Sequence, residues 1–173
     1  MNKNDLRYLK TEKGIHDAYL ALLAEKQAGG VTVAALCRSA MINKTTFYKH
    51  YETLDALHTS VCKAFVEETV TTCPGIAKAY CDPAEGVHEL VKTLQEKSGT
   101  LMLLFAGDLP YLINLIEECL LRIYLKDVTS PEKEAAICFA IGGAARVLLS
   151  SEPAPSNGEE RVEMIIDLIK KVL

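Results

Sequence analysis

The sequence predicts an all-α protein that folds as two helical domains. Apolar residues recur at helical spacing along most of the 173 residues, and caps, prolines and glycines divide them into separate segments. No alternating strand pattern and no internal repeat is visible. A chain of this length can bury a substantial core. We expect an N-terminal domain of residues 1–53 and a C-terminal domain of residues 54–173.

The first helix is expected over residues 5–28, before a stop at Gly29-Gly30. Its apolar side chains recur at i, i+3, i+4 and i+7: Ile15, Ala18, Tyr19 and Leu22. Four basic residues stand at or near its start: Lys3, Arg7, Lys10 and Lys13. They either reach the phosphates of a nucleic acid or form a frayed, solvated helix end.

Residues 32–51, TVAALCRSAMINKTTFYKHY, predict two short helices joined by a tight turn. Thr32 and Asn43 are the expected N-caps, because their side-chain oxygens can accept amide protons of a first helical turn. The apolar stripe of the first of these helices is Val33, Leu36 and Ala40. Two capped helices of about two turns each, joined by about three residues, form a helix-turn-helix pattern.

The second of these helices has two faces of different chemistry. At about 100° per residue, Phe47 and Tyr51 share one face, which we expect to be buried. The opposite face carries hydroxyls and a cation: Thr45, Thr46, Tyr48 and Lys49. A face without a carboxylate suits phosphates and base edges. A solvated helix face is the alternative, although such faces usually mix both charge signs.

Charge is distributed unevenly along the chain, whose formal net charge is −4. Residues 1–51 carry eight Lys/Arg against four Asp/Glu, whereas residues 52–173 carry eleven against nineteen. A basic N-terminal segment on an acidic body indicates that only the first part approaches a polyanion.

Residues 32–57, TVAALCRSAMINKTTFYKHYETLDAL, resemble the DNA-binding segment of TetR/AcrR-family transcriptional regulators. The matching positions are Thr32, Val33, Leu36, Cys37, Ala40, Ile42, Asn43, Lys44, Thr46, Phe47, Tyr48, His50, Tyr51, Thr53 and Leu57. The resemblance covers about fifty N-terminal residues, and the remainder matches only in being helical. It implies an N-terminal three-helix helix-turn-helix DNA-binding domain and a C-terminal helical ligand-binding and dimerisation domain.

The resemblance also implies the DNA contacts, position by position. The residues expected on phosphates are Thr32, Lys44, Tyr48 and His50. The residues expected nearest the base edges are Thr45, Thr46 and Lys49.

Three positions depart from the family pattern. Met41 replaces the turn glycine, so a residue with a Cβ must adopt the conformation of the turn. If that conformation is left-handed, the strain is about 1 kcal/mol. Thr45 replaces a small residue and adds a hydroxyl, and Leu54 replaces a basic residue, so one phosphate contact of the family is expected to be missing.

Caps and prolines set the helix boundaries expected in the C-terminal domain. Thr53 caps a helix from Leu54 to about Thr72, which Pro74-Gly75 ends. On this helix His58 is expected to pack or hydrogen-bond, with a sensor role as the alternative. Four later helices are expected over residues 83–97, 110–126, 131–151 and 159–173, with an apolar segment at 100–106 and a loop at 152–158. Asp82 and Ser130 are caps followed by proline.

The middle of the chain is where the resemblance implies a small-molecule effector. Candidate lining residues are Phe105, Tyr111, Leu115 and Cys119, with His88, Asn114 and Arg122 as scattered polar groups. An apolar cavity with a few polar groups is typical of a ligand site. Core packing needs the same apolar residues, and it is the alternative.

The last two expected helices suggest a partner chain. Small and apolar residues on them are candidates for a homodimer interface: Ala140, Gly143, Val147, Val162, Ile165 and Ile169. An intrachain core would explain either helix alone, but together they resemble the four-helix dimer interface of the family. A two-fold dimer would place two recognition helices about 34–36 Å apart over double-stranded DNA with a pseudo-palindromic operator.

Other classes of function find little support. There is no run of eighteen apolar residues and no apolar signal region at the start, so we expect a cytoplasmic protein without a membrane partner. The six cysteines show no zinc-like spacing and are expected to be reduced thiols, with a redox pair of Cys73 and Cys81 as the alternative. No metal or cofactor is expected. No phosphate loop or catalytic constellation is visible, so we do not expect an enzyme.

The sequence therefore predicts a one-component DNA-binding transcriptional regulator, in our interpretation a repressor. A small ligand in the C-terminal domain would control its operator affinity. Two alternatives stay open: a TetR-like activator or co-regulator switched by a protein partner, and a helical interaction module without DNA binding.

Overall fold

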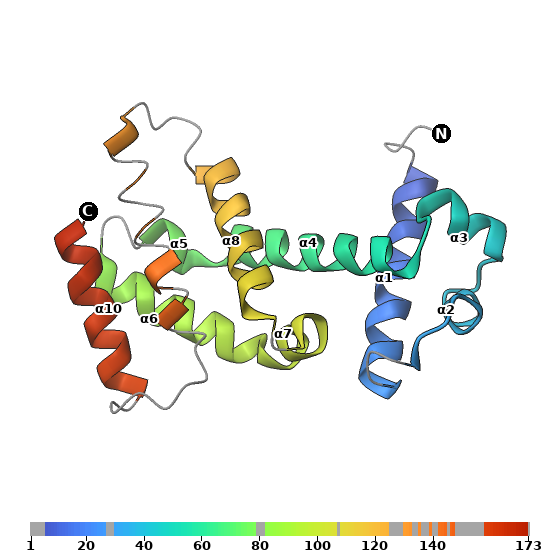
Figure 1. Cartoon of the computed structure of the whole chain (residues 1–173), viewed down its shortest axis with the longest axis horizontal. Helices are drawn as coiled ribbons and strands as arrows, with labels where there is room; N and C mark the ends of the chain where they lie inside the picture. The colour runs from blue at the N-terminus through green and yellow to red at the C-terminus, as the bar shows by residue number, and fades with distance from the viewer. Residues whose placement is uncertain are drawn as a thin grey trace. The chain divides into compact units, whose positions relative to one another are not determined.

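The computed structural model is built of helices (Figure 1). It describes residues 6–26, 30–78, 82–106, 108–124, 130–132, 135, 139, 142–144, 146–147 and 158–172. Within these ranges no residue lies in a strand, which confirms the predicted all-α class. The helices with defined bounds are α1 (Leu6–Lys26), α2 (Val33–Ser39), α3 (Lys44–His50), α4 (Leu54–Thr72), α5 (Pro74–Lys78), α6 (Pro83–Glu96), α7 (Ser98–Phe105), α8 (Leu109–Tyr124) and α10 (Gly158–Val172).

The chain divides into two compact units, Met1–Lys63 and Ala64–Leu173. The division falls inside α4, so the first unit contains the first ten residues of that helix. These ten residues were expected in the C-terminal domain, residues 54–173. Each unit has its own buried side chains and is described separately below.

The core of the first unit lies where α1, α2, α3 and the start of α4 meet. Helix α1 packs against α2, and α2 packs against α3. Each of these four helices contributes at least one fully buried side chain, for example Ile15, Leu36, Phe47 and Leu57. Each such burial contributes about 1.5–3 kcal/mol relative to an exposed side chain. The predicted stripe of α1 is confirmed, because all four of its residues are buried.

Polar groups join α1 to the segment that follows α3. The Tyr51 hydroxyl donates to Glu12 Oε1 at 3.0 Å and lies 2.8 Å from His16 Nε2. Ser60 Oγ on α4 lies 3.3 Å from the same hydroxyl. Burial raises the pKa of Tyr51, so its hydroxyl stays protonated and able to donate. A second contact joins Tyr19 to His58 Nδ1 at 3.1 Å, which gives His58 the hydrogen-bonding role expected for it.

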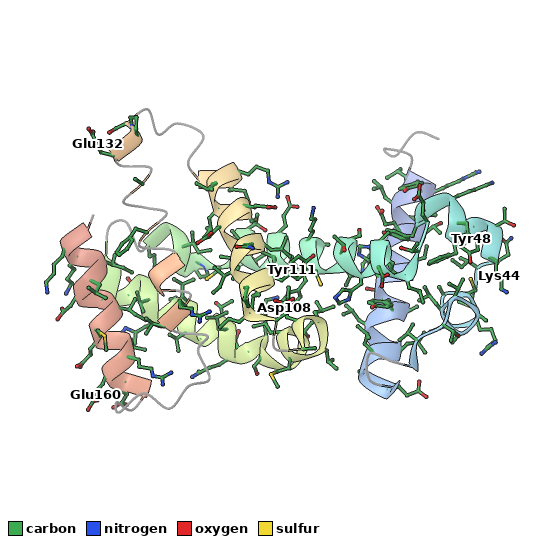
Figure 2. The ribbon with its side chains drawn as sticks, viewed as in Figure 1. Lys44, Tyr48, Asp108, Tyr111, Glu132 and Glu160 are labelled. Carbon is green, nitrogen blue, oxygen red and sulfur yellow. The ribbon has the colours of Figure 1, made fainter. Side chains whose placement is uncertain are left out.

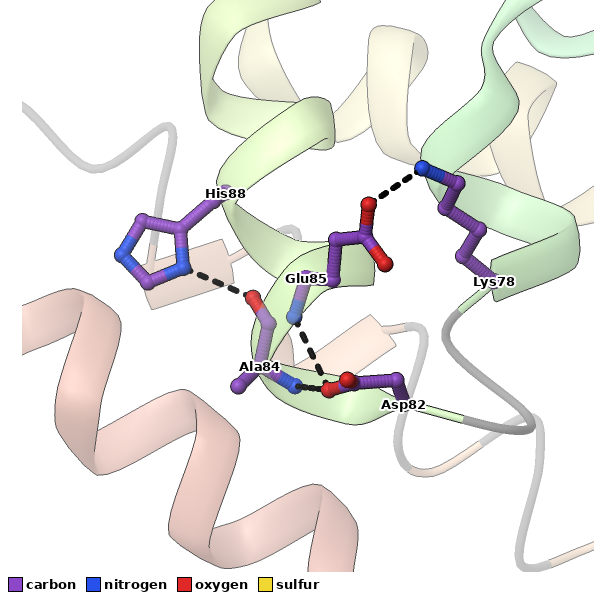
Figure 3. Close-up of polar contacts among 5 residues, drawn as sticks. All are labelled: Lys78, Asp82, Ala84, Glu85 and His88. Atoms are coloured by element: carbon purple, nitrogen blue, oxygen red, sulfur yellow. Dashed lines mark hydrogen bonds and ion pairs between the residues drawn. The ribbon is translucent and has the colours of Figure 1, made fainter.

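Several helix starts were predicted correctly from caps. Thr53 Oγ1 accepts the amide proton of Ala56 at 3.0 Å at the start of α4. Asp82 Oδ1 accepts from the amides of Ala84 and Glu85, each at 3.1 Å, at the start of α6 (Figure 3). In the same figure Lys78 of α5 forms an ion pair with Glu85.

Three predicted boundaries in the second unit need correction. Pro74-Gly75 follows the end of α4 as predicted, but it also begins a further helix, α5, because proline fits the first turn of a helix. The apolar segment expected at 100–106 is part of a helix, α7, which begins at Ser98. Helix α8 begins at Leu109, one residue before the predicted Pro110, because Asp108 Oδ1 accepts the amide proton of Tyr111 at 3.1 Å.

The core of the second unit includes a cluster between α6 and α10, which lie side by side (Figure 1). Its buried members are Val87, Ile165, Ile166 and Ile169, and Ala84, Val91, Ala144, Val147 and Val162 pack against them. Helix α5 packs closely on α6, since a Cβ on Gly75 would lie 2.5 Å from the carbonyl oxygen of Gly86. Glycine at this position therefore permits the close approach of two backbones.

The expected helix over residues 131–151 is described only in part. Residues 131–132, 135, 139, 142–144 and 146–147 are helical, and Ala140 lies outside the described residues.

Among the described helices, none alone is long and apolar enough to cross a membrane. Helices α7 and α8 are long and apolar enough only when taken together, and the chain bends by 112° between them.

Candidate nucleic-acid interface

Two caps hold α2 and α3 in place. Thr32 Oγ1 accepts the amide proton of Ala35 at 3.2 Å, and Asn43 Oδ1 accepts that of Thr46 at 2.7 Å. Both cap residues have extended backbone conformations, as N-caps do. The helix-turn-helix pattern predicted from residues 32–51 is therefore confirmed as local structure.

The turn between α2 and α3 closes by two backbone hydrogen bonds. The amide of Met41 donates to the carbonyl of Arg38 at 3.3 Å, and the amide of Ile42 donates to the carbonyl of Cys37 at 3.0 Å. This pair of bonds is the Schellman motif, in which the residue after the C-cap is left-handed. Met41 has φ of 52°, so the Cβ strain anticipated for it is present, at about 1 kcal/mol.

Aromatic packing fixes which side of α3 is exposed. Phe47 is 0% exposed and Tyr51 is 7% exposed, so both lie on the buried side as predicted. The rings of Tyr48 and Phe47 pack in a T-shaped arrangement at a centroid distance of 5.2 Å, and the Tyr48 side chain remains 56% exposed. The buried phenylalanine therefore supports a tyrosine that points outward.

The outward side of this segment is basic. We define the basic surface as five exposed side chains: Arg38, Lys44, Thr45, Tyr48 and Lys49. Lys44 projects away from α1 (Figure 2). No Asp or Glu occurs from residue 26 to residue 51. Thr32 is also exposed, and Thr46 is partly buried. Arg38 was not singled out from the sequence; its place off the apolar stripe of α2, in a segment without acidic residues, was the available signal.

His50 is less accessible than the resemblance implies. Its ring stacks on Tyr8 at a centroid distance of 4.0 Å and an interplanar angle of 22°. Its Nδ1 is buried and has no hydrogen-bond partner among the described groups. Burial lowers the pKa of His50, against a smaller opposite effect of Glu12, and so favours the neutral ring. Tyr8 was missed in the sequence, although it lies seven residues before Ile15 and so continues the stripe of α1.

The four candidate effector residues lie around the junction of α7 and α8. Phe105, Leu115 and Cys119 are buried, and Tyr111 is partly buried. The rings of Phe105 and Tyr111 lie 5.8 Å apart, and Tyr111 follows Asp108 at the start of α8 (Figure 2). Arg122 on α8 forms an ion pair with Glu67 on α4 at 3.1 Å. These residues form a packed apolar region, and ligand binding by them stays a prediction.

The candidate dimer residues divide into covered and exposed ones. Ile165 and Ile169 are 2% and 8% exposed in the single chain, where they pack with Val87 of α6. They therefore belong to the intrachain core. Val147 and Val162 pack against the same cluster, and Gly143 is exposed. The outer side of α10 carries two large apolar side chains that were not singled out, Met164 and Leu168, each 48% exposed.

The cysteines among the described residues are buried: Cys37, Cys62, Cys73 and Cys119. Burial raises the pKa of Cys62 to about 11, which keeps its thiol protonated. Cys73 Sγ lies 3.4 Å from Thr93 Oγ1, while Cys81 lies outside the described residues. Among the residues described, no group of three or more His, Cys, Asp or Glu could hold a metal ion.

Comparison with known proteins identifies the fold. No protein-family model matches the sequence, and no curated protein matches it. The chain is similar in structure to a transcriptional regulator of the TetR/AcrR family from Aquifex aeolicus VF5, with a TM-score of 0.52 and 16% sequence identity. The match covers 94% of this chain and 99% of the other. The fold is therefore that of a TetR/AcrR-family regulator, as predicted.

Proposed function

We propose that this protein is a DNA-binding transcriptional regulator of the TetR/AcrR type. The observation that carries the proposal is the basic surface on a helix-turn-helix, with two exposed lysines and no carboxylate from residue 26 to residue 51. Duplex DNA is a polyanion that accepts such a helix in its major groove. The similarity of fold to a known regulator supports the same function.

In the proposed complex, α3 lies in the major groove. Lys44 and Tyr48 bind phosphates, and Thr32 donates its hydroxyl proton to a phosphate while its oxygen keeps the cap. Thr45, Thr46 and Lys49 lie nearest the base edges. His50 acts as a neutral donor through Nε2, because a buried Nδ1 without a partner is better unprotonated.

The second unit would supply dimerisation and control. We place the homodimer surface on the outer side of α10, where Met164 and Leu168 are exposed. A small effector would bind between α7 and α8 near Phe105, Tyr111, Leu115 and Cys119, and would lower DNA affinity, so that the protein acts as a repressor. A thermal-shift screen of small compounds, followed by a DNA competition assay, tests this control.

DNA binding is tested first by selecting duplexes from a randomised library with the purified protein. Fluorescence anisotropy on a selected duplex should show affinity that falls steeply with salt, by a slope of about −0.9 per phosphate contact. Tyr48→Ala and Lys49→Ala should each weaken binding about tenfold or more without loss of helicity. Lys170→Ala, an exposed lysine of α10, is the matched control and should bind as the parent does.

The proposal fails if no duplex is enriched, or if a scrambled duplex binds equally well. Retained affinity in both Tyr48→Ala and Lys49→Ala would contradict the contacts while leaving DNA binding itself intact.

A further inference from the structure

The turn between α2 and α3 requires a left-handed residue at position 41. The amide of Met41 donates to Arg38 and that of Ile42 donates to Cys37, and both bonds form only if the chain reverses at this residue. Glycine adopts this conformation without strain, whereas methionine does not. Local structure therefore favours glycine here and gives no reason for a long side chain.

Packing gives no reason for it either. Met41 is 91% exposed, the highest value among the exposed large apolar side chains in the described part of the chain. Ala106 is the other described non-glycine residue with positive φ, at 44°, but alanine is small and ends α7. A side chain that strains the backbone and has almost no contact within its own chain acts through what it meets outside.

The surroundings of Met41 indicate what it meets. Arg38 and Lys44 are exposed three residues before and three residues after it, so it lies within the basic surface. It lies two residues before the cap of α3, at the end of that helix whose residues contact base edges in helix-turn-helix proteins. Thymine is the base that presents an apolar group, its C5-methyl, in the major groove, and methionine is flexible enough to pack against it.

We propose that Met41 determines sequence specificity by packing against a thymine methyl group in the major groove of the operator. This inference rests on the proposed function, since it needs α3 to lie in that groove. The contact adds a thymine preference next to the positions read by Thr45 and Lys49.

The test uses the full-length protein and a duplex enriched from a randomised library. Each thymine is replaced singly by deoxyuridine, which removes only the methyl group. At one or two thymines per half-site, the parent protein should lose about three- to fivefold in affinity. Met41→Gly should bind the unmodified duplex more weakly by the same factor and should lose nothing further at those thymines.

The controls separate this contact from folding. Met41→Gly should unfold at the same or a higher urea concentration, because glycine relieves the strained backbone. Ala106→Gly relieves the corresponding strain in the second unit and should leave DNA affinity unchanged.

Two results would overturn the inference. One is a Met41→Gly variant that binds the unmodified duplex as tightly as the parent. The other is a Met41→Gly variant that binds more weakly but still loses the same factor as the parent at every thymine, which would place Met41 on the sugar–phosphate backbone instead. In each of these cases Tyr48→Ala still loses affinity, whereas a failure of the proposed function leaves no selective binding for any variant.

Discussion

At the scale of single residues, the Tyr51 hydroxyl makes polar contacts with α1 and α4 in the first unit. We expect Tyr51→Phe to lower the free energy of unfolding by about 1–3 kcal/mol, because Glu12 and His16 each lose a partner at a partly buried site. Urea unfolding followed by circular dichroism measures the change. Tyr48→Phe removes a hydroxyl from an exposed ring and should leave unfolding unchanged. Equal stability of the two variants would contradict a structural role for these contacts.

His16 makes the stability of the first unit depend on pH. Burial lowers its pKa below the ordinary value of 6.5, an effect that Glu12 and Asp17 oppose and Lys13 reinforces. Between the lowered pKa of His16 in the folded chain and 6.5, the unfolded chain therefore binds a proton that the folded chain does not. Stability falls as the pH falls through this window and is independent of this group above it. Burial also lowers the pKa of His50, so its effect on stability has the same sign.

We expect His16→Gln to reduce this pH dependence, because glutamine can still donate to Tyr51 but does not titrate. Urea unfolding at a series of pH values between 7.5 and roughly 5 provides the measurement. An unchanged slope in His16→Gln would show that other groups cause the loss of stability.

Some of the site could be predicted residue by residue and some could not. The caps Thr32 and Asn43 and the buried pair Phe47 and Tyr51 follow from local hydrogen-bonding chemistry and helical spacing. The stack of His50 on Tyr8 joins residues 42 positions apart, so it depends on how α1 packs and no local pattern predicts it. That stack is why His50 is less exposed than its position in the motif implies.

At the scale of elements, α3 has only seven residues and depends on its cap. Asn43→Asp keeps the capping oxygen but adds a negative charge next to the basic surface, so it tests the effect of charge without removing the cap. We expect unchanged or slightly higher stability, because aspartate caps as well as asparagine and its charge suits a helix N-terminus. We expect DNA affinity to fall about tenfold, because a carboxylate then faces phosphates. Urea unfolding and anisotropy measure the two effects, and a variant that binds DNA normally would contradict the proposed approach of α3.

The short helices of the second unit mark the limit of prediction at this scale. Proline and glycine at positions 74 and 75 indicate a break, and the helix that begins there is five residues long. What stabilises α5 is its packing on α6, where Gly75 allows the backbones to approach. Tertiary contacts therefore determine whether such a short helix forms, whereas the longer α4 and α6 were predicted from their caps and the spacing of their apolar residues.

At the scale of the whole molecule, the two units carry opposite charge. Residues 1–63 carry nine Lys/Arg against six Asp/Glu, whereas residues 64–173 carry ten against seventeen. For a protein that binds DNA with its first unit, an acidic remainder disfavours contact by any other surface. The sequence predicts this division from composition alone, whereas the side of α10 that remains exposed became apparent only from its packing on α6.

The exposed side of α10 makes self-association testable without disturbing the core. We expect the parent protein to sediment as a dimer and Leu168→Glu as a monomer of unchanged helicity, because Leu168 is 48% exposed while Ile165 and Ile169 stay packed on α6. The monomer should also bind an operator duplex about tenfold or more weakly, since two linked half-site contacts become independent. Glu163→Gln, an exposed change on the same helix, should remain dimeric. A monomeric parent, or a dimeric Leu168→Glu, would place self-association elsewhere or exclude it.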